Sequence, residues 1–201
     1  MGGKCTSVLL QAGLLAGAAL LILAVFRFGG LDHALTSHFY DPAASAFPLK
    51  DAWLLAVAGH TGLKWTMLAL WLLCLARGGA LRRGALYMAA IALAVLLLKH
   101  YSPVSCPWDL LEYGGREPQA GRCLPAAHPL TGFALFGLAL ALRDAPRQAR
   151  IAFLAACAIG LLAGAVQVAR GAHFASHVLW TAWVAWGVTL LLAAAPPRWR
   201  A

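Results

Sequence analysis

The chain has 201 residues, of which 62% are hydrophobic and 11% are charged, and its formal net charge is +9. A soluble domain carries about 25% charged residues, so this composition excludes a water-soluble core. It indicates an all-α, polytopic membrane protein that forms a single domain over residues 1–201. The positive charge does not call for a nucleic-acid partner, because membrane proteins collect Lys and Arg on the cytoplasmic side.

Six apolar segments are predicted, in chain order, to be membrane helices, because a span takes about 20 apolar residues. They lie at roughly 8–26, 60–76, 84–99, 128–142, 151–169 and 178–195. The first is interpreted as a membrane helix and not as a signal peptide, because no small-residue cleavage site clearly follows it. The segment 48–60 is apolar but flanked by charge and too short to cross, so we expect it to lie at the membrane interface.

The charged residues divide unevenly between the two ends of these six helices. Nine cations and a single acid, Asp144, fall on the side that holds both chain ends. Seven cations and six acids fall on the opposite side. Because Lys and Arg are retained in cytoplasmic loops, the split predicts that both termini are cytoplasmic and that the loop at 100–127 faces outside.

Most of the reactive side chains fall at the predicted outer ends of the helices. Lys99 ends the third helix, and His128 begins the fourth. Arg170, His173 and His177 lie between the fifth and sixth helices at a spacing of i, i+3 and i+7, which places them on one face if they are helical. In an up-and-down bundle these helix ends are all able to be neighbours.

These residue types suit a phosphate ligand at the outer membrane surface. Lys and Arg neutralise phosphoryl oxygens. One imidazole can attack phosphorus, and a second can protonate the leaving oxygen. His173 and His128 are the candidates for those two roles.

Other interpretations stay open on the residues alone. Lys99 could anchor its helix at the interface, and His128 could serve only as an interfacial cap. His173 and His177, with His128 or Cys106, could supply zinc ligands. Neighbouring cations would disfavour that metal, and neither a metal nor another cofactor is expected.

The three segments resemble the signature of the type 2 phosphatidic acid phosphatase family, a family of membrane lipid phosphatases. That signature reads Lys-x6-Arg-Pro, then Pro-Ser-Gly-His, then Ser-Arg-x5-His-x3-Asp. The corresponding residues here are Lys99 with Cys106 and Pro107, then Pro125, Ala126, Ala127 and His128, then Val166 and Gln167 with His173 and His177. The resemblance covers about residues 60–195, and "SCPWDL" at 105–110 is similar to one bacterial branch.

The chain departs from this signature at four positions. Cys106 stands for the first-motif Arg, Ala126 for the second-motif Ser, Gln167 for the third-motif Arg and His177 for the Asp that orients the nucleophile. Arg122 and Arg170 are candidates to replace the lost cations. His177 could still hydrogen-bond His173, but a neutral partner stabilises an imidazolium less than a carboxylate does.

The resemblance implies an integral-membrane phosphatase or phosphotransferase that acts on lipid phosphate or pyrophosphate through a phosphohistidine. It implies a multi-pass protein of the bacterial inner membrane with the site facing the periplasm, and membrane lipids as its partners. The implied catalytic residues are His173, His128 and His177, and the implied phosphate-binding residues are Lys99, Arg170, Arg122 and Gln167. The main alternative is a lipid-phosphate-binding protein of the same fold that has lost catalysis. Phosphatidic acid-like lipids, undecaprenyl pyrophosphate and lipid A are all candidate ligands.

Two of the five cysteines, Cys106 and Cys123, fall in the long outer loop, just before the first- and second-motif prolines. The outer compartment is oxidising, so we expect a disulfide between them. Closing this loop would stabilise the fold by roughly 3 kcal/mol in the chain-entropy model and would fix Lys99 relative to His128. A membrane thiol oxidoreductase built on this pair is a further alternative, although the chain has no CxxC motif.

Overall fold

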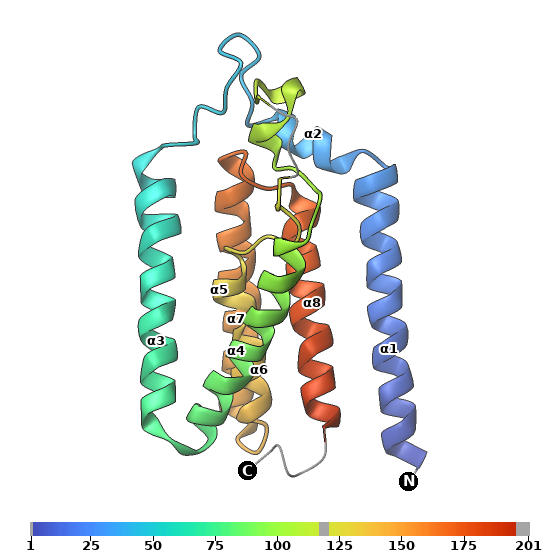
Figure 1. Ribbon diagram of the computed structural model, residues 1–201. Helices are drawn as coiled ribbons and strands as arrows, with labels where there is room; N and C mark the ends of the chain where they lie inside the picture. The colour runs from blue at the N-terminus through green and yellow to red at the C-terminus, as the bar shows by residue number, and fades with distance from the viewer. Residues whose placement is uncertain (1, 117–120, 196–201) are drawn as a thin grey trace.

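The computed structural model describes residues 2–116 and 121–195, and their side chains from residue 9 onward. The described residues contain helices and no strand, apart from a single bridge between Asp41 and Ala46. Figure 1 shows the long helices running side by side between two ends of the molecule. The predicted all-α class is therefore confirmed.

Each predicted helix is present, with different ends. The first is α1 (Gly2–Ile22) continued by the π-helix η1 (Leu23–Phe28), and the third is α4 (Gly79–His100). The fourth is α5 (Leu130–Phe133) followed by α6 (Leu135–Ala141), the fifth is α7 (Pro146–Ala169) and the sixth is α8 (Ala175–Ala194). Short helices also occur in the loops, namely α2 (Leu31–Ser37), η3 (Pro107–Asp109) and η4 (Leu111–Tyr113).

The second helix begins earlier than predicted. A π-helix, η2 (Leu54–Gly62), runs directly into α3 (Leu63–Arg77). The predicted start of this helix at residue 60 is therefore wrong, because residues 54–60 form its first part. The position of this segment at the membrane interface stays a prediction. No charge or proline falls between residue 52 and Lys64, so nothing in the local sequence stops the helix.

Within the part of the chain that the structure describes, four helices are long and apolar enough to cross a membrane, namely Leu9–Phe28, Gly79–His100, Pro146–Ala169 and Ala175–Ala194. The apolar helix Leu130–Ala141 is shorter. Figure 1 shows that α5 begins lower in the bundle than the upper ends of α3 and α7. The chain that precedes α5 therefore lies between the start of α5 and the upper end of the bundle. Four candidate spans and the apolar surface indicate a membrane protein, and the six-span arrangement stays a prediction.

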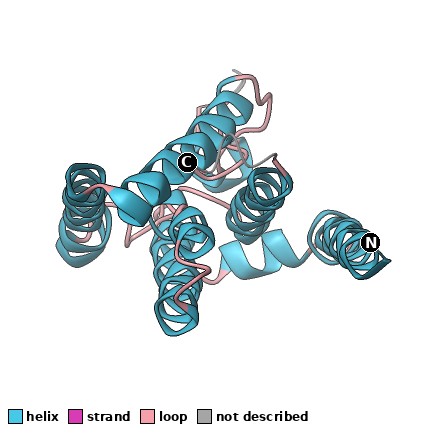
Figure 2. Cartoon of the chain, turned by 90° about the horizontal axis from the view of Figure 1, so that it is seen from below, coloured by secondary structure: helices cyan, strands magenta, loops and turns pink. Residues whose placement is uncertain are grey.

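The core lies where α4, α5, α6, α7 and α8 meet, around buried side chains such as Ile91, Val95 and Phe133. The closest approach joins α5 and α7. A Cβ added to Gly132 would lie 2.0 Å from the backbone nitrogen of Gly160, so only glycine permits this crossing. Figure 2 shows α1 at the edge of the bundle, where Trp183 Nε1 donates a hydrogen bond to the Leu15 carbonyl at 2.8 Å.

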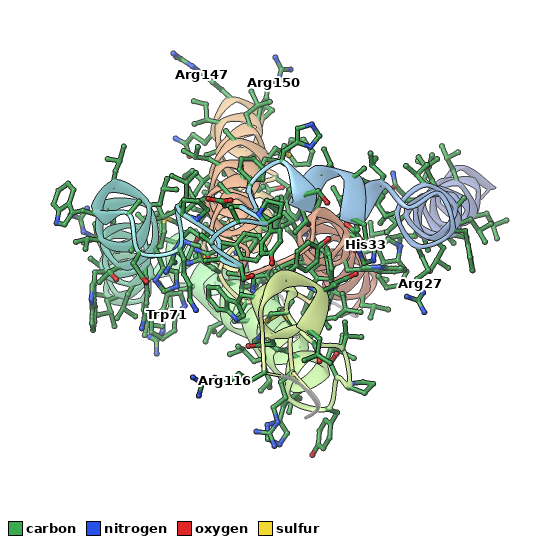
Figure 3. The ribbon with its side chains drawn as sticks, turned by 90° about the horizontal axis from the view of Figure 1, so that it is seen from above. Arg27, His33, Trp71, Arg116, Arg147 and Arg150 are labelled. Carbon is green, nitrogen blue, oxygen red and sulfur yellow. A yellow bond between two sulfur atoms is a disulfide. The ribbon has the colours of Figure 1, made fainter. Side chains whose placement is uncertain are left out.

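The two ends of the bundle differ in chemistry. The lower end in Figure 1 holds the start of α1, the turn between α3 and α4, and the turn between α6 and α7. Its cations include Arg147 and Arg150, which are exposed and point outward in Figure 3. The upper end carries α2, η3, η4 and the connection between α7 and α8. The motif residues converge toward this upper end.

Candidate active site

A tight turn after α7 directs His173 into the bundle. The backbone N–H groups of Ala172 and His173 both donate to the Gln167 carbonyl, at 2.9 and 3.3 Å. Gly171 adopts a positive φ of 71°, as glycine does just after a helix C-terminus, and a Cβ there would lie 2.4 Å from the Phe47 ring. This turn leaves His173 only 7% exposed.

The His173 ring lies against Cys123. Its Nδ1 is 3.0 Å from Cys123 Sγ, and Cys123 is fully buried. Burial lowers the pKa of His173 well below its ordinary value. The positive charges of His177, Lys99 and His128 act in the same direction, while a backbone hydrogen bond with Cys123 opposes them. His173 is therefore neutral at pH 7 and retains one ring lone pair for attack.

His128 lies between α5 and the η2 helix. Its Nε2 is 3.1 Å from the Gly59 carbonyl, and its ring centroid is 4.3 Å from that of His60. Burial lowers the pKa of His128 to about 4, against the opposing effect of the Gly59 hydrogen bond. The charges of His60, Arg170 and Lys64 contribute to this lowering. A general acid must carry a proton, so His128 needs a nearby anion to raise its pKa before it can act.

Lys99 and Arg122 meet, but through the Arg122 backbone. Lys99 Nζ donates a hydrogen bond to the Arg122 carbonyl. Arg122 has a positive φ of 48° and an exposed side chain. The structure thus places Lys99 beside the site and shows Arg122 contributing a carbonyl there.

Arg170 and Gln167 form a pair of donors on one side of the site. Arg170 Nε donates to the Lys50 carbonyl at 2.7 Å, and Arg170 Nη1 donates to Gln167 Oε1 at 3.4 Å. Gln167 is 3% exposed, and its Nε2 has no hydrogen-bond partner. A buried donor without an acceptor costs about 1–3 kcal/mol. This amide is therefore suited to an oxygen of a ligand.

His177 is buried beside His173, and the two ring centroids are 5.8 Å apart. Its Nδ1 has no hydrogen-bond partner. Its carbonyl accepts hydrogen bonds from the Ala126 N–H at 3.2 Å and the Thr181 hydroxyl at 3.0 Å. His177 thus ties the second motif to the third through its backbone, while Nδ1 of His173 faces sulfur.

The predicted cysteine pair is brought together. The two sulfurs of Cys106 and Cys123 lie 2.00 Å apart, and the two α-carbons 5.2 Å apart. With His173 the two cysteines also form a set of three possible metal ligands whose atoms all lie within 4.8 Å of one another. Sulfurs that share a bond cannot both act as thiolates. A metal would therefore require the bond to be open.

Sequence reasoning missed two residues of this region, Asp32 and His60. Asp32 is buried and accepts hydrogen bonds from the Ser176 N–H, at 2.9 Å, and from the Ser176 hydroxyl. This contact holds the first turn of α8, where Ser176 directly precedes His177. The contact joins residues 144 positions apart, and the only local signal was an acid in an outer loop.

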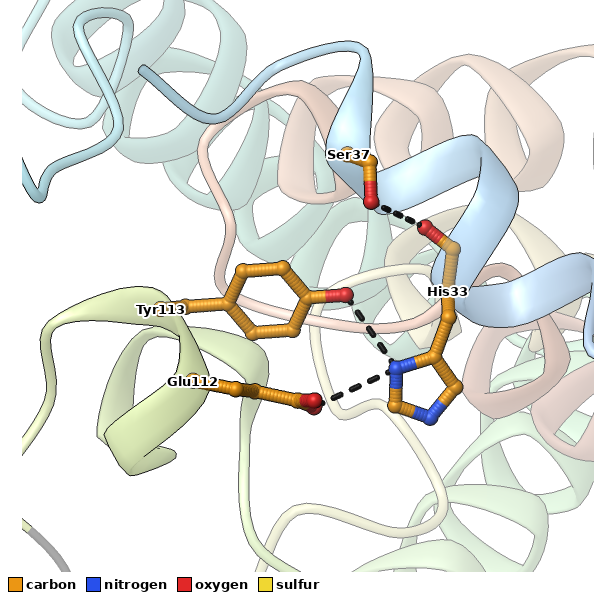
Figure 4. A network of polar contacts seen from close by, with 4 residues as sticks. All are labelled: His33, Ser37, Glu112 and Tyr113. Atoms are coloured by element: carbon orange, nitrogen blue, oxygen red, sulfur yellow. Dashed lines mark hydrogen bonds and ion pairs between the residues drawn. The ribbon is translucent and has the colours of Figure 1, made fainter. Parts of the chain in front are cut away.

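Polar contacts between His33 of α2 and the η4 residues Glu112 and Tyr113 hold α2 over the site. His33 Nδ1 lies 3.2 Å from both the Tyr113 hydroxyl and Glu112 Oε1, and Ser37 Oγ donates to the His33 carbonyl (Figure 4). Figure 3 shows His33 on α2, above the start of α8. Tyr113 also packs with Phe47 and Phe174 in an aromatic cluster next to His173. Loop residues from distant parts of the chain therefore cover the buried histidines.

The fold and site define a helical membrane protein whose upper end gathers imidazoles, cations and an unsatisfied amide. The family model of the PAP2 superfamily matches residues 80–201, a stretch that contains all three motifs. The chain belongs to this superfamily, whose members are phosphatases, and the family predicted from the motifs is confirmed. No curated protein and no solved structure matches the chain.

Proposed function

We propose that the protein is an integral-membrane phosphatase or phosphotransferase that acts on lipid phosphate or pyrophosphate headgroups at the outer face of the membrane. The proposal adds substrate, mechanism and topology to the phosphatase family that the chain belongs to. The charge split between the two bundle ends favours cytoplasmic termini and a site on the opposite side of a bacterial inner membrane.

One observation carries the proposal, namely positive charge without a counter-ion. Among the described residues, every charged group that shifts the pKa of His173 or His128 is cationic or a histidine. Lys99 and Arg170 belong to this set, and Gln167 Nε2 adds an unsatisfied donor. A phosphoryl group would supply the missing negative charge and would raise both histidine pKa values.

The proposed chemistry has two steps. Lys99, Arg170 and Gln167 hold the phosphoryl oxygens while His173 Nε2 forms a bond to phosphorus. The bond from phosphorus to the leaving oxygen breaks, and His128 gives that oxygen a proton. Water then attacks the phosphohistidine and releases phosphate, with His128 taking the proton back. An acceptor hydroxyl in place of this water gives phosphotransfer.

An apolar groove supports a lipid substrate. It has a volume of about 420 Å³ and runs between α3, α4 and α5. Its walls include Met88, Leu93 and Leu96, and its lining reaches Ala127 and Thr131 on either side of His128. An acyl chain in this groove would keep its headgroup beside the site.

A binding protein with weakened catalysis is the second candidate, and one observation favours it. His177 Nδ1 is unpartnered, and no carboxylate is recorded beside His173 among the described residues. Without a carboxylate the imidazolium character that develops during attack is less well stabilised. Such a protein would bind phosphate without releasing it.

The test is phosphate release by the purified protein from a panel of lipid phosphates and one water-soluble phosphate ester. Base-stable, acid-labile labelling should appear in wild type and be absent from His173→Ala. Leu93→Trp narrows the groove at an exposed position, so it should raise KM for long-chain substrates and leave the water-soluble ester unchanged. Phosphate binding with neither label nor release would establish the binding protein instead.

A further inference from the structure

The sulfur of Cys123 contacts the nitrogen that decides whether His173 can attack. Cys123 Sγ lies 3.0 Å from His173 Nδ1, and both residues are buried. A neutral imidazole carries one ring proton and attacks through the nitrogen that lacks it. Attack through Nε2 therefore requires the proton to sit on Nδ1, facing the sulfur.

We propose that Cys123, as a disulfide sulfur, positions His173 by accepting a hydrogen bond from Nδ1–H and so keeps Nε2 available for attack. The proposal rests on the proposed function of His173. A disulfide sulfur carries no hydrogen, so it accepts a hydrogen bond and never donates one. Cys123 thereby occupies the place that a carboxylate takes beside other catalytic histidines.

His177, which has the family position of the residue that orients the nucleophile, does not orient His173 through its own Nδ1. His177 stands where the family has its orienting Asp, yet its Nδ1 is buried without a partner. The two cysteines also have different contacts, although both stand just before a motif proline in the sequence. Cys123 Sγ contacts His173, and the part of Cys106 is to form the bond that removes the hydrogen from that sulfur.

Reduction reverses the donor and acceptor roles. Two electrons and two protons from a thiol or phosphine reductant convert the disulfide to two S–H groups. The Cys123 S–H then has His173 Nδ1 within 3.0 Å and the Ala172 carbonyl within 3.3 Å. Donation to Nδ1 moves the ring proton of His173 to Nε2, which removes the attacking lone pair without any backbone movement.

The first experiment reads the tautomer of His173 directly. Protein with nitrogen-15-labelled histidine is examined by NMR in detergent micelles, oxidised and reduced, and His173→Ala assigns the signal. A chelator is present throughout, because the reduced cysteines and His173 form a three-ligand set for Zn²⁺. We expect Nδ1–H in the oxidised protein and Nε2–H after reduction. Nε2–H in the oxidised protein overturns the proposal.

This measurement needs no turnover, so its outcome is distinct from that of the proposed function. An oxidised protein with Nδ1–H that forms no phosphohistidine would retain the contact and refute the phosphatase. If the oxidised protein carries the His173 proton on Nε2 and still forms a phosphohistidine, the role of Cys123 is refuted and the proposed function is supported.

The second experiment separates the hydrogen-bond role from tethering. In a background of Cys5→Ser, Cys74→Ala and Cys157→Ala, the variant Cys106→Gly removes the bridge and leaves Cys123 as a thiol. Methyl methanethiosulfonate then converts Cys123 S–H to S–S–CH3 and releases methanesulfinate, with incorporation followed by intact mass. The added S–CH3 group replaces the Sγ and Cβ atoms of Cys106 and restores a hydrogen-free sulfur without restoring the tether.

We expect Cys106→Gly to lower kcat at least about tenfold, with a ceiling on the order of 10⁴-fold for a histidine held in the wrong tautomer. Methylthiolation should restore most of kcat while Tm stays at the value of the unbridged protein. The matched control, Cys123→Ala, should gain nothing from the reagent. If kcat and Tm stay low together after complete modification, the pair is only a tether. The tautomer measurement decides the question on the wild-type chain if Cys106→Gly does not fold.

Discussion

The stretches of α1 with η1 and of α7 that could span a membrane have nearly the same mean hydropathy, yet 6% of the first is buried in protein and 39% of the second. Apolarity therefore predicts that a helix leaves water, and it does not say whether lipid or protein replaces the water. Both helices contain glycines, but among those whose surroundings are described only the glycines of α7 lie against a neighbouring element. A Cβ added to Gly13 or Gly17 in α1 would meet nothing within 4 Å, whereas one added to Gly160 in α7 would lie 2.5 Å from the Phe133 ring.

The proposed active site and the segments that cover it also come from different parts of the chain for the most part. α7 and the three motifs fall within the residues that match the superfamily, and α1 and α2 precede them. The matched part supplies both histidines proposed for catalysis. The preceding part supplies Asp32, α2 and Phe47, and these cover the site together with Tyr113 and Phe174 of the matched part. The first two predictions below perturb the matched part and use the preceding part as their control.

The largest effect should come from the proposed catalytic histidines. His173→Ala and His128→Ala should each lower kcat by at least about 10²-fold, because nucleophile and general acid contribute factors of that size. His38→Ala, in the cover, should retain most activity, because His38 is exposed and its Nδ1 meets only the Ala34 carbonyl. Phosphate release from each purified variant decides the matter, and equal losses in all three would mean structural damage.

Overpacking α7 should be costly where overpacking α1 is not. A Cβ at Gly160 would lie 2.5 Å from the Phe133 ring, so Gly160→Leu should destabilise the protein by about 3 kcal/mol or more. Gly17→Leu should change stability by about 0.5 kcal/mol at most. Thermal unfolding in the same detergent compares the two, and a large loss in Gly17→Leu would place a partner on the α1 face.

Acid should weaken the fold through the site. The pKa of His128 is about 4 in the folded protein and 6.5 as the ordinary value, so the unfolded chain binds more protons between these values. Stability is then fully present above pH 6.5 and falls as the pH drops, by about 2 kcal/mol at pH 5. His128→Asn should remove this share of the dependence of Tm on pH and leave the share of buried His173. Orthovanadate should also reduce the dependence, by raising the pKa of His128. A Tm that rises on acidification would contradict this assignment.

The smallest effect should follow from Asp32→Asn. The amide still accepts one hydrogen bond from Ser176, but it loses the charge that faces the first turn of α8, so we expect a loss of about 1 kcal/mol. Asp51→Asn, at an exposed position, is the matched control. Thermal unfolding of both variants checks the difference. An unchanged Tm in Asp32→Asn would mean that the cover does not stabilise the site.

Features with a local signal could be predicted from the sequence, and those made by distant contacts could not. The helices, the three motif histidine positions and the Cys106–Cys123 pairing all follow from apolar runs, motif spacing and compartment. The Asp32–Ser176 contact and the tilted ring contact of His60 with His128 depend on how the bundle closes. The early start of η2 was missed because flanking charge was given more weight than the uninterrupted apolar run.

The role of a single side chain is also difficult to predict from the sequence, as Arg122 in the connection between α4 and α5 shows. Arg122 was predicted to bind phosphate because it is a cation near a motif. Its exposed side chain and its bonded carbonyl follow from a left-handed backbone that no spacing rule indicates. Gln167, by contrast, was predicted from its motif position, and its buried, unsatisfied amide is suited to that role.

The aromatic cluster of Phe47, Tyr113 and Phe174 also bears on how long a phosphohistidine would survive. Hydrolysis of the phosphohistidine needs a water molecule to reach His173, which is almost completely buried. A slow supply of water lengthens the life of the intermediate and gives a competing hydroxyl time to intercept it. The tightness of this cover, and not the chemistry of His173, would then set the ratio of hydrolysis to transfer.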